Sequence, residues 1–276
     1  MTKPSTMSPA SSATPLIDAT KLPARERWGR AFTALREVLR NPDRTDQVLV
    51  FSTYANAGSM PRRIHRFLQD PAGRRLYDEH RTIDAHAVDL PGLARLPEDT
   101  LGRAYSDFLT SRGLTPDVFE HPPEDITDPA MAYIVQRLRQ THDLWHVVTG
   151  YDTDPASEVA LQAFTFGQLR APSSGILAVL GTLRGMSIKR DLIVDVMRGF
   201  RLGARAEKLA AFPWEDHWAA PLVEVRAMLG LPAVPRAPLE LAAKVREVIA
   251  QAVQEPSSTT GDNWLARAAA TPRAAA

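Results

Sequence analysis

Two histidines and two carboxylates lie close together near the middle of the chain, in the stretch HDLWHVVTGYDTDPASE. They are His142, Asp143, His146 and Glu158. Because the chain contains no cysteine, imidazole nitrogens and carboxylate oxygens are the side-chain donors best suited to a divalent ion. We therefore predict a metal site at these four positions, with Asp143 either a fourth ligand or a group that orients the other ligands.

Helix signals on both sides of Gly150 predict how these residues come together. Asp128-Pro129 and Asp154-Pro155 each combine a capping carboxylate with a proline that suits the first helical turn, and Gly150 is a typical helix end. Two histidines four positions apart share one helix face, with Cβ atoms about 6 Å apart. The prediction is an antiparallel helix pair in which Glu158 faces His146. Its first helix runs on from Pro129 and carries Met131, Val135, Leu138, His142 and His146 in one stripe.

Each of these residues also has an ordinary structural interpretation. A histidine on an apolar helix face is commonly a hydrogen-bonded core residue, and a carboxylate in a first turn often complements only the helix dipole. The pattern H-x-x-x-H arises by chance as well. The spacing alone therefore leaves both interpretations open.

Composition limits the class of protein. The chain has 276 residues, of which 44% are hydrophobic and 24% are charged, and its formal net charge is +1. These values indicate a globular protein and give no reason to expect nucleic acid as a partner. The absence of cysteine excludes disulfides, iron–sulfur clusters and thiol nucleophiles. No apolar run approaches the roughly 20 residues that span a bilayer. We predict a protein that is cytoplasmic or peripheral at the inner membrane surface.

The spacing of apolar residues is helical wherever it is regular, and no segment of any length alternates with a period of two. The predicted fold is all-α, a single helical domain with the helix pair at its centre. Residues 1–21 are expected to be a disordered lead-in, 22–232 the domain, and 233–276 a terminal helix and disordered tail. A first helix after Pro23 should bury a stripe that includes Phe32 and Leu39. Apolar helices between Gly175 and Phe212, interrupted at Gly199 and Gly203, should form a groove for a ligand tail.

Three stretches of the chain resemble the coenzyme Q (ubiquinone) biosynthesis protein 4 family. They are LARLPEDTLGRAYSDFL at residues 93–109, AYIVQRLRQTHDLWHVVTGY at 132–151, and WEDHWAAPLVEVRAMLGL at 214–231. The metal motif of that family is a His-Asp pair, a second His, eleven further residues and a Glu. The chain reproduces it with His142, Asp143, His146 and Glu158.

The resemblance implies an all-helical protein with a divalent metal, zinc in the usual view, with iron, manganese and magnesium as alternatives. It implies a polyprenylated aromatic substrate and a metal-dependent carboxy-lyase of ubiquinone or related prenyl-quinone biosynthesis. The reaction would remove the C1 carboxylate of a prenylated 4-hydroxybenzoate, with hydroxylation of the same carbon in some accounts. Asp143 and Glu158 are the expected catalytic residues. Expected partners are other quinone-biosynthesis enzymes and a membrane surface, and a homodimer is left open.

Other interpretations remain at this point. One is a non-catalytic scaffold that binds prenyl lipids and carries a structural metal. Another treats HDLWH as a metalloprotease pattern, but Asp143 is one methylene shorter than the glutamate that such a site requires. Near the motif, Arg137 and Arg139 could bind a substrate carboxylate or form surface ion pairs, and Trp145 could stack on the substrate or belong to the core.

Overall fold

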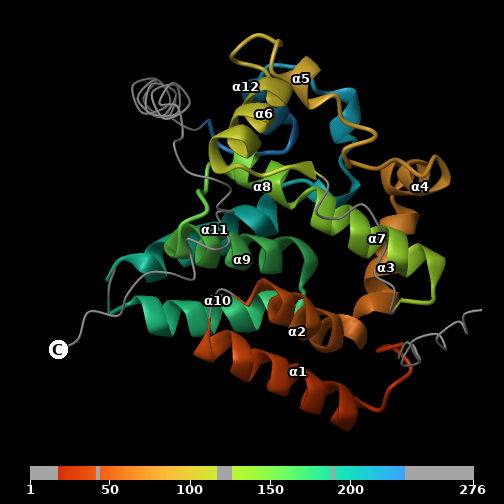
Figure 1. The fold of residues 1–276 in the computed structure, drawn as a ribbon, viewed down its shortest axis with the longest axis vertical. Coiled ribbons are helices and arrows are strands. Elements are labelled where there is room, and N and C mark those ends of the chain that lie inside the picture. Colours follow the sequence, from red (N-terminus) through yellow and green to blue (C-terminus); the bar gives the residue numbers. More distant parts are fainter. Residues whose placement is uncertain (1–17, 42–43, 117–125, 188–189, 234–276) are drawn as a thin grey trace, which may run out of the picture. The chain divides into compact units, whose positions relative to one another are not determined.

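The computed structural model describes residues 18–41, 44–116, 126–187 and 190–233, drawn in colour in Figure 1. Within these ranges the secondary structure is helical, and the nearest approach to a sheet is one isolated antiparallel bridge between Thr100 and Pro221. The all-α prediction is confirmed for this part of the chain. Most of the predicted lead-in and nearly all of the predicted terminal helix and tail lie outside the described residues.

The α-helices follow one another closely along the chain. Their bounds are α1 (Ala24–Arg40), α2 (Thr45–Ala57), α3 (Met60–Gln69), α4 (Pro71–Asp78), α5 (Leu90–Leu93), α6 (Leu101–Arg112), α7 (Pro129–Gln140), α8 (His142–Thr149), α9 (Pro155–Leu169), α10 (Pro172–Gly185), α11 (Leu192–Arg205) and α12 (Leu222–Met228). Two 3₁₀ helices, Leu209–Ala211 and Trp214–Asp216, lie between α11 and α12.

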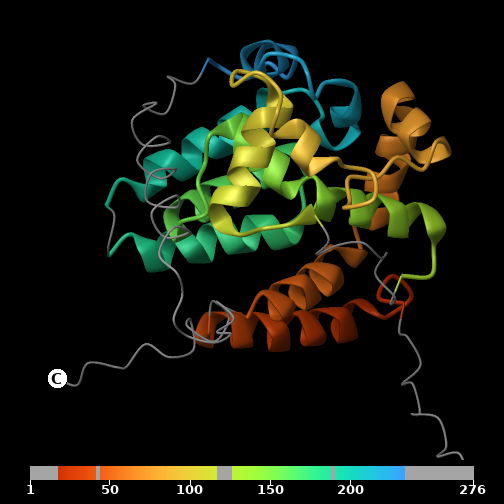
Figure 2. The same ribbon diagram turned by 45° about the horizontal axis from the view of Figure 1, so that its top comes forward.

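Helix α9 carries Glu158 in its first turn. It packs against α10 and α11, and α10 in turn packs against α1 and α2 (Figures 1 and 2). The largest hydrophobic cluster joins α6, α8, α9 and α12, with Trp145 and Phe164 in edge-to-face contact at 6.1 Å between ring centroids. The site residues on α8 and α9 are thus anchored in one core.

Local capping explains where the site helices begin and end. The Asp128 carboxylate accepts a hydrogen bond from the Met131 amide at 2.7 Å, and Asp154 accepts one from the Ala156 amide at 3.0 Å. These contacts satisfy amides that a helix start leaves without an intrahelical partner. Gly150 ends α8 with a φ of 76°, which glycine adopts without steric cost. The predicted helix starts and the predicted stop are all confirmed.

The predicted continuous helix through both histidines is wrong, because the structure breaks it at Thr141. Helix α7 ends at Gln140 and α8 begins at His142. The ψ angle of Thr141 is −2°, whereas regular helical ψ is about −42°. Neither proline nor glycine marks this position, and a β-branched threonine is only a weak signal of a helix boundary.

Two further expectations about helix faces need correction. In α1 the buried residues are Ala31, Ala34, Leu35 and Val38, whereas Phe32 is 58% exposed and Leu39 is 43% exposed. Helix α11 is not interrupted at its glycines. Instead, an added Cβ at Gly199 would lie 2.4 Å from the Ala160 carbonyl oxygen, and one at Gly203 would lie 2.1 Å from that of Phe164. The two glycines let α11 approach the backbone of α9 directly.

The expected close antiparallel pairing of α8 with α9 is not confirmed. Helix α8 packs mainly against α6, while α9 packs mainly against α10 and α11.

Residues 18–21, before α1, form a turn in which Ala19 is buried and Asp18 accepts a hydrogen bond from the Thr127 hydroxyl at 2.8 Å. Of the described helices, none combines the length and the hydropathy needed to cross a bilayer.

Candidate metal centre

Three of the four predicted ligands converge in the structure. His142 and His146 lie one turn apart on α8, and Glu158 reaches them from the first turn of α9. One donor atom from each residue belongs to a group whose members all lie within 4.8 Å of one another. His142, His146 and Glu158 could therefore hold a metal ion together.

Two of the distances between donor atoms in this group match tetrahedral coordination. The Nε2 atoms of His142 and His146 are 3.3 Å apart, and Nε2 of His146 is 3.2 Å from Oε1 of Glu158. Two ligands bound at about 2.05 Å with a tetrahedral angle lie about 3.3 Å apart. Nε2 of His142 lies near the other carboxylate oxygen, Oε2 of Glu158, at a longer distance of 4.0 Å.

The ring of His146 is held in the orientation that a metal ligand needs. Its Nδ1 lies 3.1 Å from the Tyr151 carbonyl oxygen, so Nδ1–H donates there and Nε2 is left to act as a ligand. The side chain of His146 is 1% exposed, whereas those of His142 and Glu158 are 38% and 36% exposed. The group is thus closed on the His146 side and open to solvent on the other.

Electrostatics within the group follow from burial and from the nearby charges. Burial lowers the pKa of His142, and the neighbouring His146 lowers it further. Burial would also lower the pKa of His146, but the hydrogen bond and the charge of Glu158 raise it overall. Burial would raise the pKa of Glu158, but the contact with His146 lowers it overall. Without a metal, the contact between His146 and Glu158 therefore links α8 to α9.

Asp143 lies beside this group, and its carboxylate is not one of the converging donors. Burial raises the pKa of Asp143, although the two neighbouring histidines oppose that shift. Burial and the charge of Asp143 together raise the pKa of Tyr105 on α6. Asp143 therefore takes up a proton more readily than an exposed carboxylate does.

Arg137, which the sequence suggests for substrate binding, lies in the interior. Its side chain is 1% exposed and forms a two-pronged ion pair with Glu215, at 2.8 and 3.1 Å. The same guanidinium donates to the carbonyl oxygens of Arg81 at 3.2 Å and of Phe212 at 3.0 Å. These contacts occupy both terminal nitrogens, which argues against a substrate-binding role and for a structural one. The partner of Arg137, Glu215, is not revealed by the sequence pattern.

The other two candidate substrate contacts have different settings. Arg139 is half-buried in the last turn of α7. Trp145 is 2% exposed and packs against Phe164, so the structure supports the core interpretation over a stacking platform. Two further side chains near the centre were not singled out for function by sequence reasoning. They are Phe108 and Arg112 on α6. Phe108 stacks on His146, and Arg112 contacts Phe108 and Asp152.

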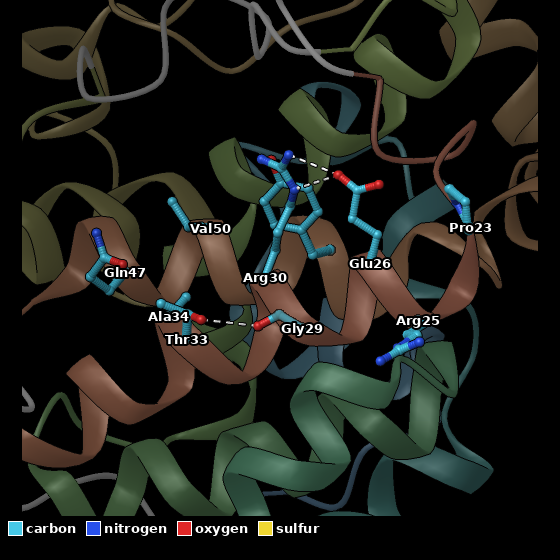
Figure 3. A pocket seen from close by; sticks show the side chains of 10 residues that line it. Pro23, Arg25, Glu26, Gly29, Arg30, Thr33, Ala34, Gln47 and Val50 are labelled. Atoms are coloured by element: carbon cyan, nitrogen blue, oxygen red, sulfur yellow. Dashed lines mark hydrogen bonds and ion pairs between the residues drawn. The ribbon is translucent and has the colours of Figure 1, made fainter.

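A groove of about 890 Å³ lies away from this centre, between α1 and α2. In Figure 3 the side chain of Arg30 is turned toward Glu26, one turn earlier on α1, to which it donates two hydrogen bonds at 3.2 and 2.9 Å. The remaining lining includes Arg25, Gln47 and Val50. This groove contains no converging set of metal ligands among its lining residues, and the candidate metal centre remains the site with a defined chemistry.

The fold and the site together define a helical protein in which two histidines and one glutamate converge and could hold a metal ion. Residues 19–235 match the family described as coenzyme Q (ubiquinone) biosynthesis protein Coq4. The chain belongs to this family, and the resemblance inferred from its motifs is confirmed. Its family is one of ubiquinone biosynthesis, as expected.

Relatives in fungi and in a cyanobacterium support this assignment. The chain is 31% identical over 195 residues to the mitochondrial ubiquinone biosynthesis protein COQ4 of Coprinopsis cinerea, covering 70% of this chain and 67% of that one. It is 34% identical over 200 residues to the corresponding protein of Podospora anserina, covering 70% of this chain and 64% of that one. The crystal structure of a Nostoc punctiforme protein assigned to ubiquinone biosynthesis superposes with a TM-score of 0.61 at 26% identity, covering 74% of this chain and 98% of that one. The fungal relatives are named as mitochondrial, so the expected cytoplasmic location finds no support.

Proposed function

We propose that this protein is a metal-dependent carboxy-lyase of ubiquinone biosynthesis, acting at C1 of a polyprenylated 4-hydroxybenzoate. The observation that carries the proposal is the set of two histidines and one carboxylate with an exposed side. Three protein donors that leave a further position accessible are typical of catalytic metal sites, whereas structural sites are usually closed by four. Zinc suits these ligands, and iron, manganese or magnesium are the alternatives.

Each of the four site residues would have its own role in the reaction. His142, His146 and Glu158 would hold the ion, which when bound supplies positive charge to the substrate carboxylate or phenolate and stabilises the charge that develops. Asp143, with its raised pKa, would hold a proton beside the ring. As the bond between C1 and the carboxylate breaks, the electron pair stays on C1 and takes that proton, and carbon dioxide leaves. Glu158 would contribute to catalysis through the charge of its carboxylate.

The test is metal removal. We expect the purified protein to bind about one equivalent of divalent metal and to release carbon dioxide from a short-chain prenylated 4-hydroxybenzoate. A chelator should abolish that release, and return of zinc or iron to the chelated protein should restore it. Oxygen uptake in the same assay distinguishes simple decarboxylation from decarboxylation with hydroxylation of C1, because the hydroxylation needs dioxygen as the oxidant. A chelated protein that stays fully active would overturn the proposal.

We also propose that the protein meets its substrate at an anionic membrane surface, through exposed apolar residues where α10 ends and α11 begins. Leu183 is 67% exposed and Val179 59%, and on α11 Val194 is 55% exposed. We call this surface the α10–α11 face; its members are Val179, Leu183, Met186, Ile193, Val194 and Met197. Helices α10 and α11 contact each other, and six exposed large apolar residues in this stretch are more than the scattered single ones that need no explanation.

Charge around the α10–α11 face favours a lipid surface as its partner. From residue 184 to residue 205 the chain has six basic residues and two acidic ones. Arg198, Arg201 and Arg205 follow the apolar end of α11 and line a hollow of about 300 Å³ with Val194 and Leu202. Exposed apolar side chains beside arginines suit the boundary between acyl chains and anionic head groups. The face adjoins the start of α9, because Leu192 and Val196 pack against Ala156 and Val159, close to Glu158.

A vesicle-binding assay tests the α10–α11 face. We expect the protein to sediment with phosphatidylcholine vesicles that contain phosphatidylglycerol, and the double substitution Leu183→Glu, Val194→Glu to weaken that binding at least about tenfold. Val223→Glu is the matched control, because Val223 is also exposed, at 58%, but lies on α12. Equal loss in the control would contradict the assignment. So would a double variant that still binds vesicles but changes from dimer to monomer, since the face would then join two copies of the chain.

A further inference from the structure

Helix α6 presents two side chains to the candidate metal centre although it contributes no ligand. The ring of Phe108 stacks on the imidazole of His146, with 5.4 Å between centroids and 24° between planes. On the Phe108 ring lies the guanidinium of Arg112, whose central carbon is 4.0 Å from the ring centroid. The Phe108 ring of α6 thus contacts both the Arg112 guanidinium and the imidazole of a candidate ligand.

Arg112 also contacts the loop that follows α8. This loop orients the His146 ring through Nδ1. Arg112 forms an ion pair with Asp152, which follows directly after Tyr151. The Tyr151 carbonyl oxygen is the acceptor for Nδ1–H of His146, at 3.1 Å. One terminal nitrogen of Arg112 also donates to the Phe108 carbonyl oxygen at 3.1 Å, which ties the guanidinium back to α6. The ring plane and the tautomer of His146 are therefore both linked to Arg112.

From this geometry we infer that Phe108 and Arg112 are positioning residues that preset His146 for metal binding. The inference rests on the proposed metal site and adds a function for α6. The stack restricts rotation of the imidazole, and the Arg112–Asp152 ion pair keeps the Tyr151 carbonyl at the Nδ1 position. Partners that orient a ligand in this way typically change metal affinity by about 10- to 100-fold when they are replaced.

Arginine suits this position better than lysine. A guanidinium is flat, so it can lie on an aromatic ring and still direct separate N–H groups to a carboxylate and a carbonyl. A lysine ammonium could keep the ion pair with Asp152 but could not cover the Phe108 ring in the same way. Arg112→Lys should therefore recover part of the metal affinity that Arg112→Met loses.

The experiment compares zinc affinity and the visible spectrum of the cobalt-substituted protein across four variants and the unsubstituted chain. We expect Phe108→Leu and Arg112→Met to weaken zinc binding about 10- to 100-fold and to alter the cobalt spectrum. Arg112→Lys should lie between them and the unsubstituted chain. Arg103→Met is the matched control, since Arg103 lies on the same helix and pairs with Asp107 at 3.0 Å, away from His146. It should leave affinity and spectrum unchanged.

The experiment distinguishes failure of the positioning inference from failure of the proposed metal site. If the unsubstituted chain binds zinc and both Phe108→Leu and Arg112→Met bind it equally well, the positioning inference is wrong while the metal site stands. If the unsubstituted chain binds neither zinc nor cobalt, the proposed metal site and the inference fail together. Thermal unfolding of each metal-free variant shows whether its fold is intact. Arg112 is 27% exposed, so Arg112→Met keeps the test decisive even if Phe108→Leu unfolds.

Discussion

Glu158→Gln is expected to weaken metal binding by more than about 100-fold and to stop carbon dioxide release, while the helical fold persists. Glutamine keeps the size of the side chain but loses the charge that the ion and the two imidazoles face. The site would then retain only two strong donors, His142 and His146. Metal content, zinc affinity and decarboxylation of a prenylated 4-hydroxybenzoate measure the effect.

The fold should survive because α9 is held by contacts that do not involve the carboxylate. Leu161 and Phe164 are fully buried in the largest core cluster, and α11 closes on the other side of the helix. Without metal, the Glu158→Gln variant differs from the unsubstituted chain by the lost ion pair with His146. Because the Glu158 side chain is 36% exposed, we expect only a small change in thermal stability. Glu224→Gln, an exposed carboxylate on α12, provides the control.

The same variant decides between the carboxy-lyase and the scaffold with a structural ion. A scaffold of that kind predicts that Glu158→Gln loses the metal and much of its thermal stability together, because metal binding would then stabilise the fold directly. Retention of the metal with unchanged affinity would contradict both interpretations. Loss of decarboxylation with intact folding and intact binding of partner enzymes is the result that the enzyme predicts.

Arg137→Met is expected to lower the free energy of unfolding by about 3 to 5 kcal/mol, the largest stability effect that we predict. The substitution leaves the Glu215 carboxylate, whose side chain is 14% exposed, without its partner inside the protein. It also removes the donors to the Arg81 and Phe212 carbonyl oxygens. Urea unfolding followed by circular dichroism measures the change.

A neighbouring ion pair supplies the control for Arg137→Met. Arg75 and Asp216 are 2.7 Å apart, but their side chains are 49% and 40% exposed, so Arg75→Met should cost less than about 1 kcal/mol. The double substitution Arg137→Met, Glu215→Leu should recover part of the loss, because it removes the unpaired charge. If Arg137→Met were as mild as Arg75→Met, the interior ion pair would have no structural role, and substrate binding by Arg137 would deserve a direct test.

Those features of the fold that depend on neighbouring residues could be predicted from the sequence. Asp128-Pro129, Asp154-Pro155 and Gly150 set helix ends through contacts within a few residues, and each prediction holds. The break at Thr141 could not be predicted, because no proline or glycine marks it and the ψ change shows only in three dimensions.

The candidate site also combines features that could be predicted from the sequence with features that could not. His142 and His146 could be paired from helical spacing. Glu158 meets them as predicted, although the close antiparallel packing of α8 and α9 from which this was predicted is not confirmed. Arg137 could not be placed in the interior, because its partner Glu215 lies 78 residues further along the chain. The exposure of Phe32 was missed for a related reason: helical periodicity identifies apolar positions but not which of them a neighbouring helix will cover.

The contact between α11 and α9 determines which parts of this chain can be engineered for heat tolerance. Exchanging helical glycines for alanine is a common way to stiffen a protein, and Gly29 on α1 has nothing within 4 Å of an added methyl group. At Gly203 the same methyl group would meet a main-chain oxygen, which cannot swing aside as a side chain can. A library design should therefore begin at open positions such as Gly29 and leave the glycines between α11 and α9 unchanged, since forcing these helices apart would also move the helix that bears Glu158.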